Sequence, residues 1–269
     1  MRCAVPCISN LNFFRYFYIN IFYPGKMKKH IPNTLTTLNL VSGLISITMV
    51  MQNHLVWAAG LIFLAAVFDY LDGTAARLLK AYSELGKQLD SLADLVSFGV
   101  APGLIMFQLL SFHCTNGCNI LERWNIIPYL ALMIPVCSAL RLAKFNIDPR
   151  QEVNFIGLPT PANAIFFASI PLILHLQDRI HTFIQLDFMV ALFSNPRVLA
   201  ALSVFFSYLL ISEFRIFSMK FKSMGWKENQ HRFIFLGLSL ILLVVFSISA
   251  IPLIIMAYLL LSLVFQKKM

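Results

Sequence analysis

Long apolar stretches follow one another along the chain, separated by short polar segments. Eight of them have the length expected of helices that cross or enter a membrane: 35–52, 54–75, 92–112, 126–145, 160–177, 197–217, 233–248 and 251–265. The last two are predicted as a hairpin, because a single helix over 233–265 would extend roughly 50 Å, beyond a bilayer core of about 30 Å. The segment SISAIP (247–252) offers the turn. Residues 181–196 are predicted as an interfacial helix. The pattern therefore indicates an all-α, polytopic membrane bundle of about eight helices.

Composition and charge support this class. The chain is 59% hydrophobic and 12% charged, whereas soluble domains carry about a quarter charged residues. Its net charge of +9 does not indicate a nucleic-acid partner, because the basic residues are dispersed among helix ends. With the N-terminus in the cytoplasm, only Arg123, Arg179 and Arg197 of the 21 Lys and Arg residues fall outside. This asymmetry is typical of membrane proteins and places the loop after the second span at the cytoplasmic face.

Two segments outside the predicted spans are distinctive: the N-terminal residues 1–26 and the cysteine-containing segment 113–118. Residues 1–26 are aromatic-rich but interrupted by polar residues, and they make a poor signal peptide. They are treated as an N-terminal extension, either an interfacial segment or the product of a mis-set start, since MKKHIPNTLT from Met27 looks like a natural beginning. The segment HCTNGC (113–118) has no matching second Cys/His pair, so Cys114 and Cys118 are interpreted as loop cysteines that could form a local disulfide.

The segment DYLDGTAARLLKAYSELGKQLDSLAD (69–94) carries the candidate chemistry. Asp69 and Asp72 are three residues apart and Asp90 and Asp94 four apart, so each pair shares one helix face. If the second span continues to about Lys80 and the third begins near Gln88, all four carboxylates converge. Four like charges repel one another unless a cation lies between them. Oxygen ligands favour Mg²⁺ or Mn²⁺, and the spacing predicts a metal site.

Small and basic residues surround these aspartates. Gly73 and Ala76 leave a flat strip on the same helix, suited to close helix packing or to a flat ligand, and Arg77 supplies a positive charge suited to phosphate. Together with two metal ions, these features indicate a nucleotide-diphosphate site. A cation transporter is the alternative from another class, but its acidic residues would lie near mid-membrane in several spans.

The spacing Asp69-x2-Asp72-Gly73-x2-Ala76-Arg77-x8-Gly86-x3-Asp90-x3-Asp94 resembles the full signature of the CDP-alcohol phosphotransferase family. The resemblance implies a six-helix catalytic core, assigned to residues 27–217, followed by a hairpin over 218–269. It implies transfer of a phosphatidyl or similar group from a CDP-linked donor to an alcohol, with release of CMP. The implied site residues are metal ligands Asp69, Asp72, Asp90 and Asp94, catalytic residues Asp90 and Asp94, and CDP-binding residues Gly73, Ala76, Arg77 and Gly86.

Flanking stretches resemble the serine-using bacterial branch of this family. They are IPNTLTTLNLVSGLISI (31–47), SFGVAPG (97–103), RLAKFNI (141–147) and FIGLPTPANA (155–164). This resemblance implies CDP-diacylglycerol as donor, L-serine as acceptor and a homodimer among membrane lipids of the bacterial cytoplasmic membrane. Arg141, Lys144 and Asn146 are candidates for recognising serine or phosphate, with positive-inside topology as the simpler explanation of the two cations. Glycerol 3-phosphate, inositol phosphate and phosphatidylglycerol remain alternative acceptors.

Overall fold

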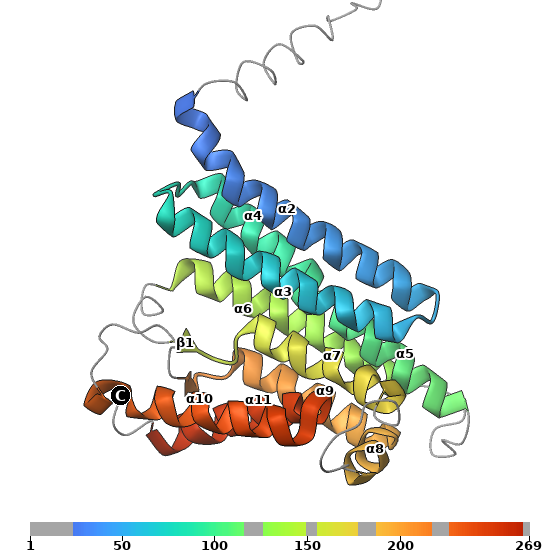
Figure 1. Ribbon diagram of the computed structural model, residues 1–269. Coiled ribbons are helices and arrows are strands. Elements are labelled where there is room, and N and C mark those ends of the chain that lie inside the picture. Colours follow the sequence, from blue (N-terminus) through green and yellow to red (C-terminus); the bar gives the residue numbers. More distant parts are fainter. Residues whose placement is uncertain (1–23, 116–125, 149–154, 177–186, 217–225, 266–269) are drawn as a thin grey trace, which may run out of the picture.

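The computed structural model describes residues 24–115, 126–148, 155–176, 187–216 and 226–265, and these are almost entirely helical (Figure 1). The elements in chain order are α2 (Pro24–Met51), α3 (Leu55–Leu78), α4 (Glu84–Asp94), the π-helix η1 (Leu95–Val100), α5 (Ala101–Thr115), the 3-10 helix η2 (Ile127–Leu132), α6 (Met133–Ile147), β1 (Phe155–Ile156), α7 (Thr160–Leu176), α8 (Asp187–Phe193), α9 (Pro196–Ile211), β2 (Arg215–Ile216), α10 (Trp226–Phe246), the 3-10 helix η5 (Ser247–Ser249) and α11 (Ala250–Phe265). The predictions for residues 1–23 and for Cys118 lie outside the described residues.

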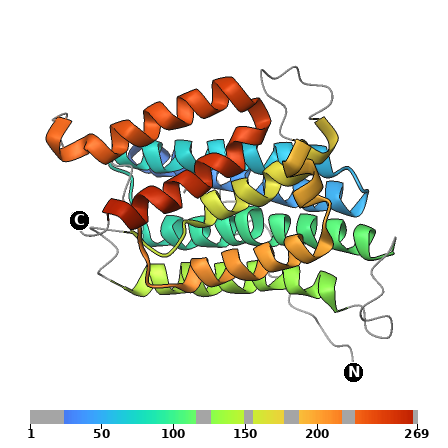
Figure 2. The ribbon, with the colours of Figure 1, turned by 90° about the horizontal axis from the view of Figure 1, so that it is seen from below.

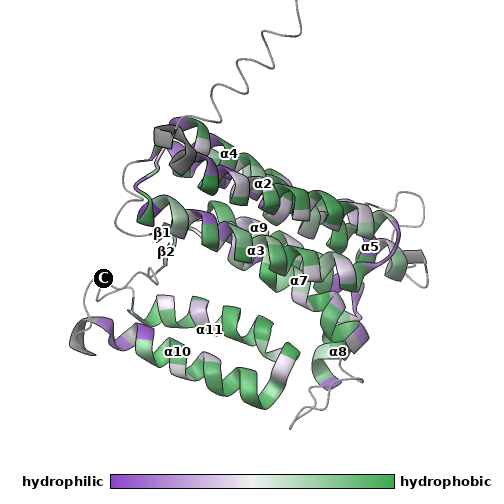
Figure 3. Cartoon of the chain, turned by 45° about the horizontal axis from the view of Figure 1, so that its top comes forward, coloured by the Kyte–Doolittle hydropathy of each residue, from purple (hydrophilic) through white to green (hydrophobic). Residues whose placement is uncertain are grey.

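The predicted all-α membrane bundle is confirmed, and each of the eight predicted stretches contains a helix. By length and hydropathy, five described segments could cross a membrane: His30–Met51, Leu55–Leu78, Glu84–Phe112, Ile127–Ile147 and Arg232–Phe265. The pair α8 and α9, bent by 81°, would make a sixth if it forms one span, and α7 is a shorter apolar helix. Hydrophilic residues gather near helix ends, as at the α3–α4 turn and the start of α10 (Figure 3). The chain is thus an integral membrane protein.

The third span begins earlier than its hydropathy predicts. Its helix starts at Glu84, where the Ser83 hydroxyl accepts a hydrogen bond of 3.0 Å from the Gly86 amide and caps the first turn. The first turns of α4 are largely polar and exposed, so hydropathy does not indicate that they belong to the span. The aspartate pair at the end of α4 is therefore held on a helix that is already three turns long.

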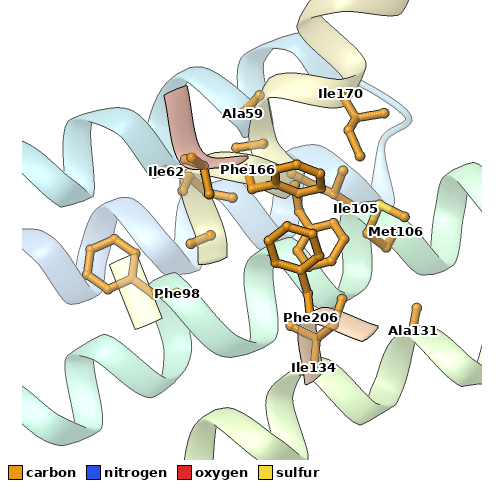
Figure 4. Packing of buried hydrophobic residues seen from close by; sticks show 14 of the residues in the cluster. Ala59, Ile62, Phe98, Ile105, Met106, Ala131, Ile134, Phe166, Ile170 and Phe206 are labelled. Atoms are coloured by element: carbon orange, nitrogen blue, oxygen red, sulfur yellow. The ribbon is translucent and has the colours of Figure 1, made fainter. Parts of the chain in front are cut away.

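Aromatic and aliphatic side chains from most of the described helices fill the core (Figure 4). The rings of Phe166 on α7 and Phe206 on α9 stack with centroids 4.0 Å apart and planes 24° apart. Phe98 of η1 and Ile62 of α3 are both completely buried and belong to the same cluster. This packing fixes α3, η1, α7 and α9 relative to one another, and so fixes the helices that carry the candidate site.

The last two helices form the predicted hairpin. Ser247 adopts a left-handed backbone conformation with φ of 53°, and the short η5 turn sends the chain back beside α10. Figure 2 shows α10 and α11 lying antiparallel, with α11 between α10 and α7. Large apolar side chains such as Leu240, Ile241 and Val244 on α10 are exposed, as expected of a lipid-facing surface.

The short strand β1, between α6 and α7, pairs antiparallel with β2, which follows α9. Phe155 pairs with Ile216 and Ile156 with Arg215. Gly157 follows with φ of +79°, and its amide donates a hydrogen bond of 2.8 Å to the Phe214 carbonyl. A Cβ at this position would lie 2.6 Å from the Leu210 carbonyl oxygen. Only glycine fits here, both in conformation and in space.

Candidate active site

The turn between α3 and α4 brings the two aspartate pairs together. Carboxylate oxygens of Asp69, Asp72 and Asp90 all lie within 4.8 Å of one another. Asp69 and Asp72 lie in the C-terminal half of α3 and Asp90 lies in the last two turns of α4, so helical periodicity directs the three side chains to one place. The α3–α4 turn, the end of α6 and β1 all lie at one end of the bundle, whereas the end of α5 and α8 lie at the other (Figure 1).

Asp94 adjoins this group from one turn further along α4. Its side chain is buried, within hydrogen-bonding reach of Asp69, and it accepts a hydrogen bond of 3.2 Å from the Asn39 amide. The π-helix η1 begins at the next residue, Leu95. Insertions of this kind are frequent at functional sites, because they redirect the side chains on either side of them.

Helix α2 donates hydrogen bonds to two of the aspartates. The sequence pattern did not predict these contacts. The Thr36 hydroxyl donates a hydrogen bond of 2.7 Å to Asp72 Oδ2, and Asn39, one turn later, contacts Asp94. The Ser97 hydroxyl of η1 donates to the Asn39 backbone carbonyl at 2.9 Å. The signal in the sequence was the spacing of Thr36 and Asn39, which lie three residues apart within one span and therefore share a helix face.

The donor set fits a hard divalent cation. The three clustered carboxylates offer oxygen ligands alone, as Mg²⁺ and Mn²⁺ prefer. Asp90 Oδ1 is buried and has no hydrogen-bond partner among the residues that the structure describes. A buried carboxylate oxygen with no partner is costly, and a bound cation is the natural partner for it.

The predicted nucleotide-binding residues lie in two different environments: Gly73, Ala76 and Arg77 lie along one face of α3, whereas Gly86 is packed against α2. A Cβ on Gly73 would meet nothing within 4 Å, so this face of α3 is open. Arg77 lies beside it, where its Nε donates a hydrogen bond of 2.9 Å to the Gly73 carbonyl, and Ala76 is half-buried. Gly86 differs, because a Cβ there would lie 2.9 Å from the Asn33 side-chain oxygen of α2. This glycine lets α4 approach α2 closely.

The three predicted acceptor-binding residues do not share one environment. Arg141 is buried, donates a hydrogen bond of 3.3 Å from Nη1 to the Thr160 hydroxyl, and interacts electrostatically with Asp94. Lys144 instead forms an ion pair of 3.2 Å with Glu213 near the surface. The Asn146 amide donates a hydrogen bond of 2.9 Å to the Ser91 hydroxyl of α4. Arg141 is therefore the one of the three that is directed toward the aspartates.

Comparison with known proteins gives consistent results. The family model described as CDP-alcohol phosphatidyltransferase matches residues 29–210. A CDP-diacylglycerol–serine O-phosphatidyltransferase of Bacillus subtilis is 31% identical over 190 residues, which cover 69% of this chain and 89% of that relative. The enzyme of the same name from Mycobacterium leprae is 37% identical over 142 residues, or 50% of this chain and 44% of the relative. An archaetidylserine synthase of Methanothermobacter thermautotrophicus is 34% identical, covering 62% of this chain and 70% of the relative. The match to the mycobacterial relatives thus spans less than half of their length.

Proposed function

The chain belongs to the CDP-alcohol phosphatidyltransferase family, and on that premise we propose that it is a phosphatidylserine synthase. It transfers the phosphatidyl group of CDP-diacylglycerol to the hydroxyl of L-serine and releases CMP. The observation that carries this proposal is the aspartate cluster together with a buried guanidinium, since Arg141 interacts electrostatically with Asp94. The names of the relatives support serine as the acceptor.

The protein acts in the cytoplasmic membrane of a bacterium with this site facing the cytoplasm. The asymmetry of Lys and Arg supports that orientation, and so does the position of the α3–α4 turn and the end of α6 at one end of the bundle (Figure 1). Residues 27–217 form the catalytic core, and 218–269 add the hairpin. Family resemblance favours a homodimer.

The carboxylates of Asp69, Asp72, Asp90 and Asp94 would hold two Mg²⁺ or Mn²⁺ ions. A divalent ion there would offset negative charge on the phosphoryl oxygens and on the departing CMP. The unpartnered Oδ1 of Asp90 supports this assignment.

The donor nucleotide lies along the open strip of α3. Gly73 and Ala76 leave room for the flat base and ribose, and Arg77 is placed beside Gly73 to pair with phosphate. Gly86 contributes indirectly by bringing α4 against α2. The acyl chains stay in the lipid, which the exposed apolar faces of the helices adjoin.

The transfer itself needs a proton acceptor and an oriented nucleophile. Asp94 accepts the proton of the serine hydroxyl, while the hydrogen bond from Asn39 holds its carboxylate in place. The serine oxygen then forms a bond to the phosphorus that carries diacylglycerol, and the bond from that phosphorus to the CMP oxygen breaks. Arg141 pairs with the serine carboxylate, so its proximity to Asp94 directs the hydroxyl toward the base.

The same chemistry with another alcohol is the second candidate, because the aspartate signature is common to the family. A phosphorylated acceptor such as glycerol 3-phosphate or inositol phosphate would favour several basic side chains together. Near Asp94 the described residues offer one buried cation, Arg141, which suits a single carboxylate. Lys144 is 39% exposed and paired with Glu213.

An acceptor screen on the purified protein tests the proposal. CMP release from CDP-diacylglycerol is measured with Mg²⁺ or Mn²⁺ and, in separate reactions, L-serine, glycerol 3-phosphate, inositol phosphate or phosphatidylglycerol. The proposal predicts release that depends on serine and little with the other alcohols. A greater response to one of those alcohols would reassign the acceptor, and release with none of them would remove the proposed activity.

A further inference from the structure

Four buried polar side chains on three helices are related through Arg141, which interacts electrostatically with Asp94. They are defined here as the Arg141 cluster: Arg141 of α6, Thr160 and Asn163 of α7, and Tyr258 of α11. The exposed fraction is 7% for Arg141, 9% for Tyr258 and 0% for both α7 residues. The Thr160 hydroxyl accepts a hydrogen bond from Arg141, and Asn163, three residues further along the first turn of α7, shares the helix face of Thr160.

The cluster has hydrogen-bonding capacity that the protein does not use. Among the described residues, neither the amide nitrogen nor the amide oxygen of Asn163 has a hydrogen-bond partner, and Arg141 Nε has none either. Buried polar groups are nearly always paired, so the unpaired donors and the unpaired acceptor of these two side chains require an explanation. The Asn163 oxygen can accept from an ammonium group, while its nitrogen and the guanidinium can donate to a carboxylate. Those two groups together make up the backbone end of an α-amino acid.

Tyr258 brings the C-terminal hairpin to this cluster. The buried face of α11 packs against α7 and β2, and Tyr258 lies on that face. It is close enough to Arg141 for the two groups to interact electrostatically. Its ring also contacts Phe235 of α10, with centroids 5.4 Å apart. The family model matches residues 29–210, so Tyr258 lies outside the matched residues.

We propose that the carboxylate and ammonium groups of the acceptor amino acid bind at the Arg141 cluster, and that the hairpin forms one side of this site through Tyr258. The proposal rests on the proposed function and assigns Asn163 and Tyr258 to its acceptor side. An amino acid held there by Arg141 and Asn163 points its short hydroxymethyl group toward Asp94. The hairpin thereby contributes to substrate recognition in addition to membrane anchoring.

Two substitutions in the full chain test this assignment. Asn163→Leu keeps the side-chain size but removes both polar atoms, and Tyr258→Phe removes one oxygen. For each variant, kcat and the KM values for serine and for CDP-diacylglycerol are measured, together with the rate with ethanolamine, which lacks the carboxylate. We expect Asn163→Leu to raise the serine KM at least tenfold and Tyr258→Phe at least threefold. The KM for CDP-diacylglycerol should stay within twofold, and the preference for serine over ethanolamine should fall. Tyr208→Phe, at an exposed position on α9, is the matched control and should leave all values unchanged.

Stability separates a binding role from a structural one. Because the Asn163 amide makes no hydrogen bond to any described residue, Asn163→Leu should keep or raise the melting temperature in detergent. If that variant does not fold, Tyr258→Phe carries the test. A wild-type enzyme that uses serine, with an unchanged serine KM in the folded variants, would overturn this assignment alone. No serine-dependent CMP release by the wild type would overturn the proposed function.

Discussion

The side-chain amide of Asn39 donates a hydrogen bond of 3.2 Å to the carboxylate of Asp94, which lies 55 residues further along the chain. Both side chains are buried, and α2 is held there by a second hydrogen bond from Ser97 to the Asn39 carbonyl. The first described helix therefore sets the orientation of the carboxylate proposed to accept the serine proton.

Removing the Asn39 amide should slow turnover without abolishing substrate binding. Asn39→Leu fills nearly the same volume but leaves Asp94 without its donor. Outer-shell partners of this kind typically change activity by about 10–100-fold when they are lost. We expect a decrease in kcat of that order, with serine and CDP-diacylglycerol KM values within about threefold of wild type. Steady-state kinetics on the purified variant check this, and a kcat close to wild type would show that Asp94 does not need this contact.

Neighbouring threonines on α2 give a matched pair for the metal site. The Thr36 hydroxyl donates to Asp72, whereas the exposed Thr37 hydroxyl donates only to the Asn33 carbonyl of its own helix. Thr36→Val should raise the Mn²⁺ or Mg²⁺ concentration for half-maximal activity about tenfold, because the loss of a hydrogen bond to a metal-binding carboxylate typically weakens metal binding by about 10–100-fold. Thr37→Val should change it less than twofold. Equal effects of the two substitutions would remove the role assigned to Thr36.

Arg141 and Lys144 should respond differently to the same substitution. Arg141→Met is expected to raise the serine KM by tenfold or more, because it removes the buried cation nearest Asp94. Lys144→Met should change that KM less than threefold and cost at most about 1 kcal/mol of stability, as is typical of an exposed ion pair. Parallel titrations with serine decide between them. A larger effect at Lys144 would move acceptor recognition to the surface.

The sequence predicted the parts of the site that local periodicity controls. Asp69, Asp72 and Asp90 meet because their spacings match the helical repeat, and one short turn connects their helices. The supports from Thr36 and Asn39 were not predictable in this way, since these contacts span 36 and 55 residues and depend on how α2 packs.

Two other features needed the structure for the same reason. The sequence grouped Asn146 with Arg141, but its amide is bonded to Ser91 of α4. The role of Gly86 follows from the approach of Asn33, which lies on another helix. A hydropathy pattern contains no information about either distance, whereas it does contain the positions of the helices themselves.

Close packing at Gly43 should make this glycine essential for the positions of α2 and η1. A Cβ there would lie 2.8 Å from the Ser97 Cα, and overpacking of this kind costs about 1–3 kcal/mol. Gly43→Ala should therefore lower the melting temperature in detergent and reduce activity, because Ser97 holds Asn39.

The control is Gly60→Ala on α3. A Cβ at Gly60 meets nothing within 4 Å, and alanine is better than glycine by about 1 kcal/mol in a helix interior. Gly60→Ala should leave the melting temperature unchanged or raise it. A Gly43→Ala protein as stable and as active as Gly60→Ala would contradict the close contact between α2 and η1.

Incorporation of labelled serine into lipid by the purified protein tests the central claim most directly. Wild type, Asp90→Asn and Asp94→Asn are each supplied with CDP-diacylglycerol, labelled L-serine and Mn²⁺ or Mg²⁺, after melting curves have shown that all three are folded. We expect labelled phosphatidylserine from the wild type, no label after chelation of the metal, and nearly complete loss of incorporation in both variants. Near-normal incorporation by either folded variant, or no incorporation by the wild type with metal present, would contradict the proposed function.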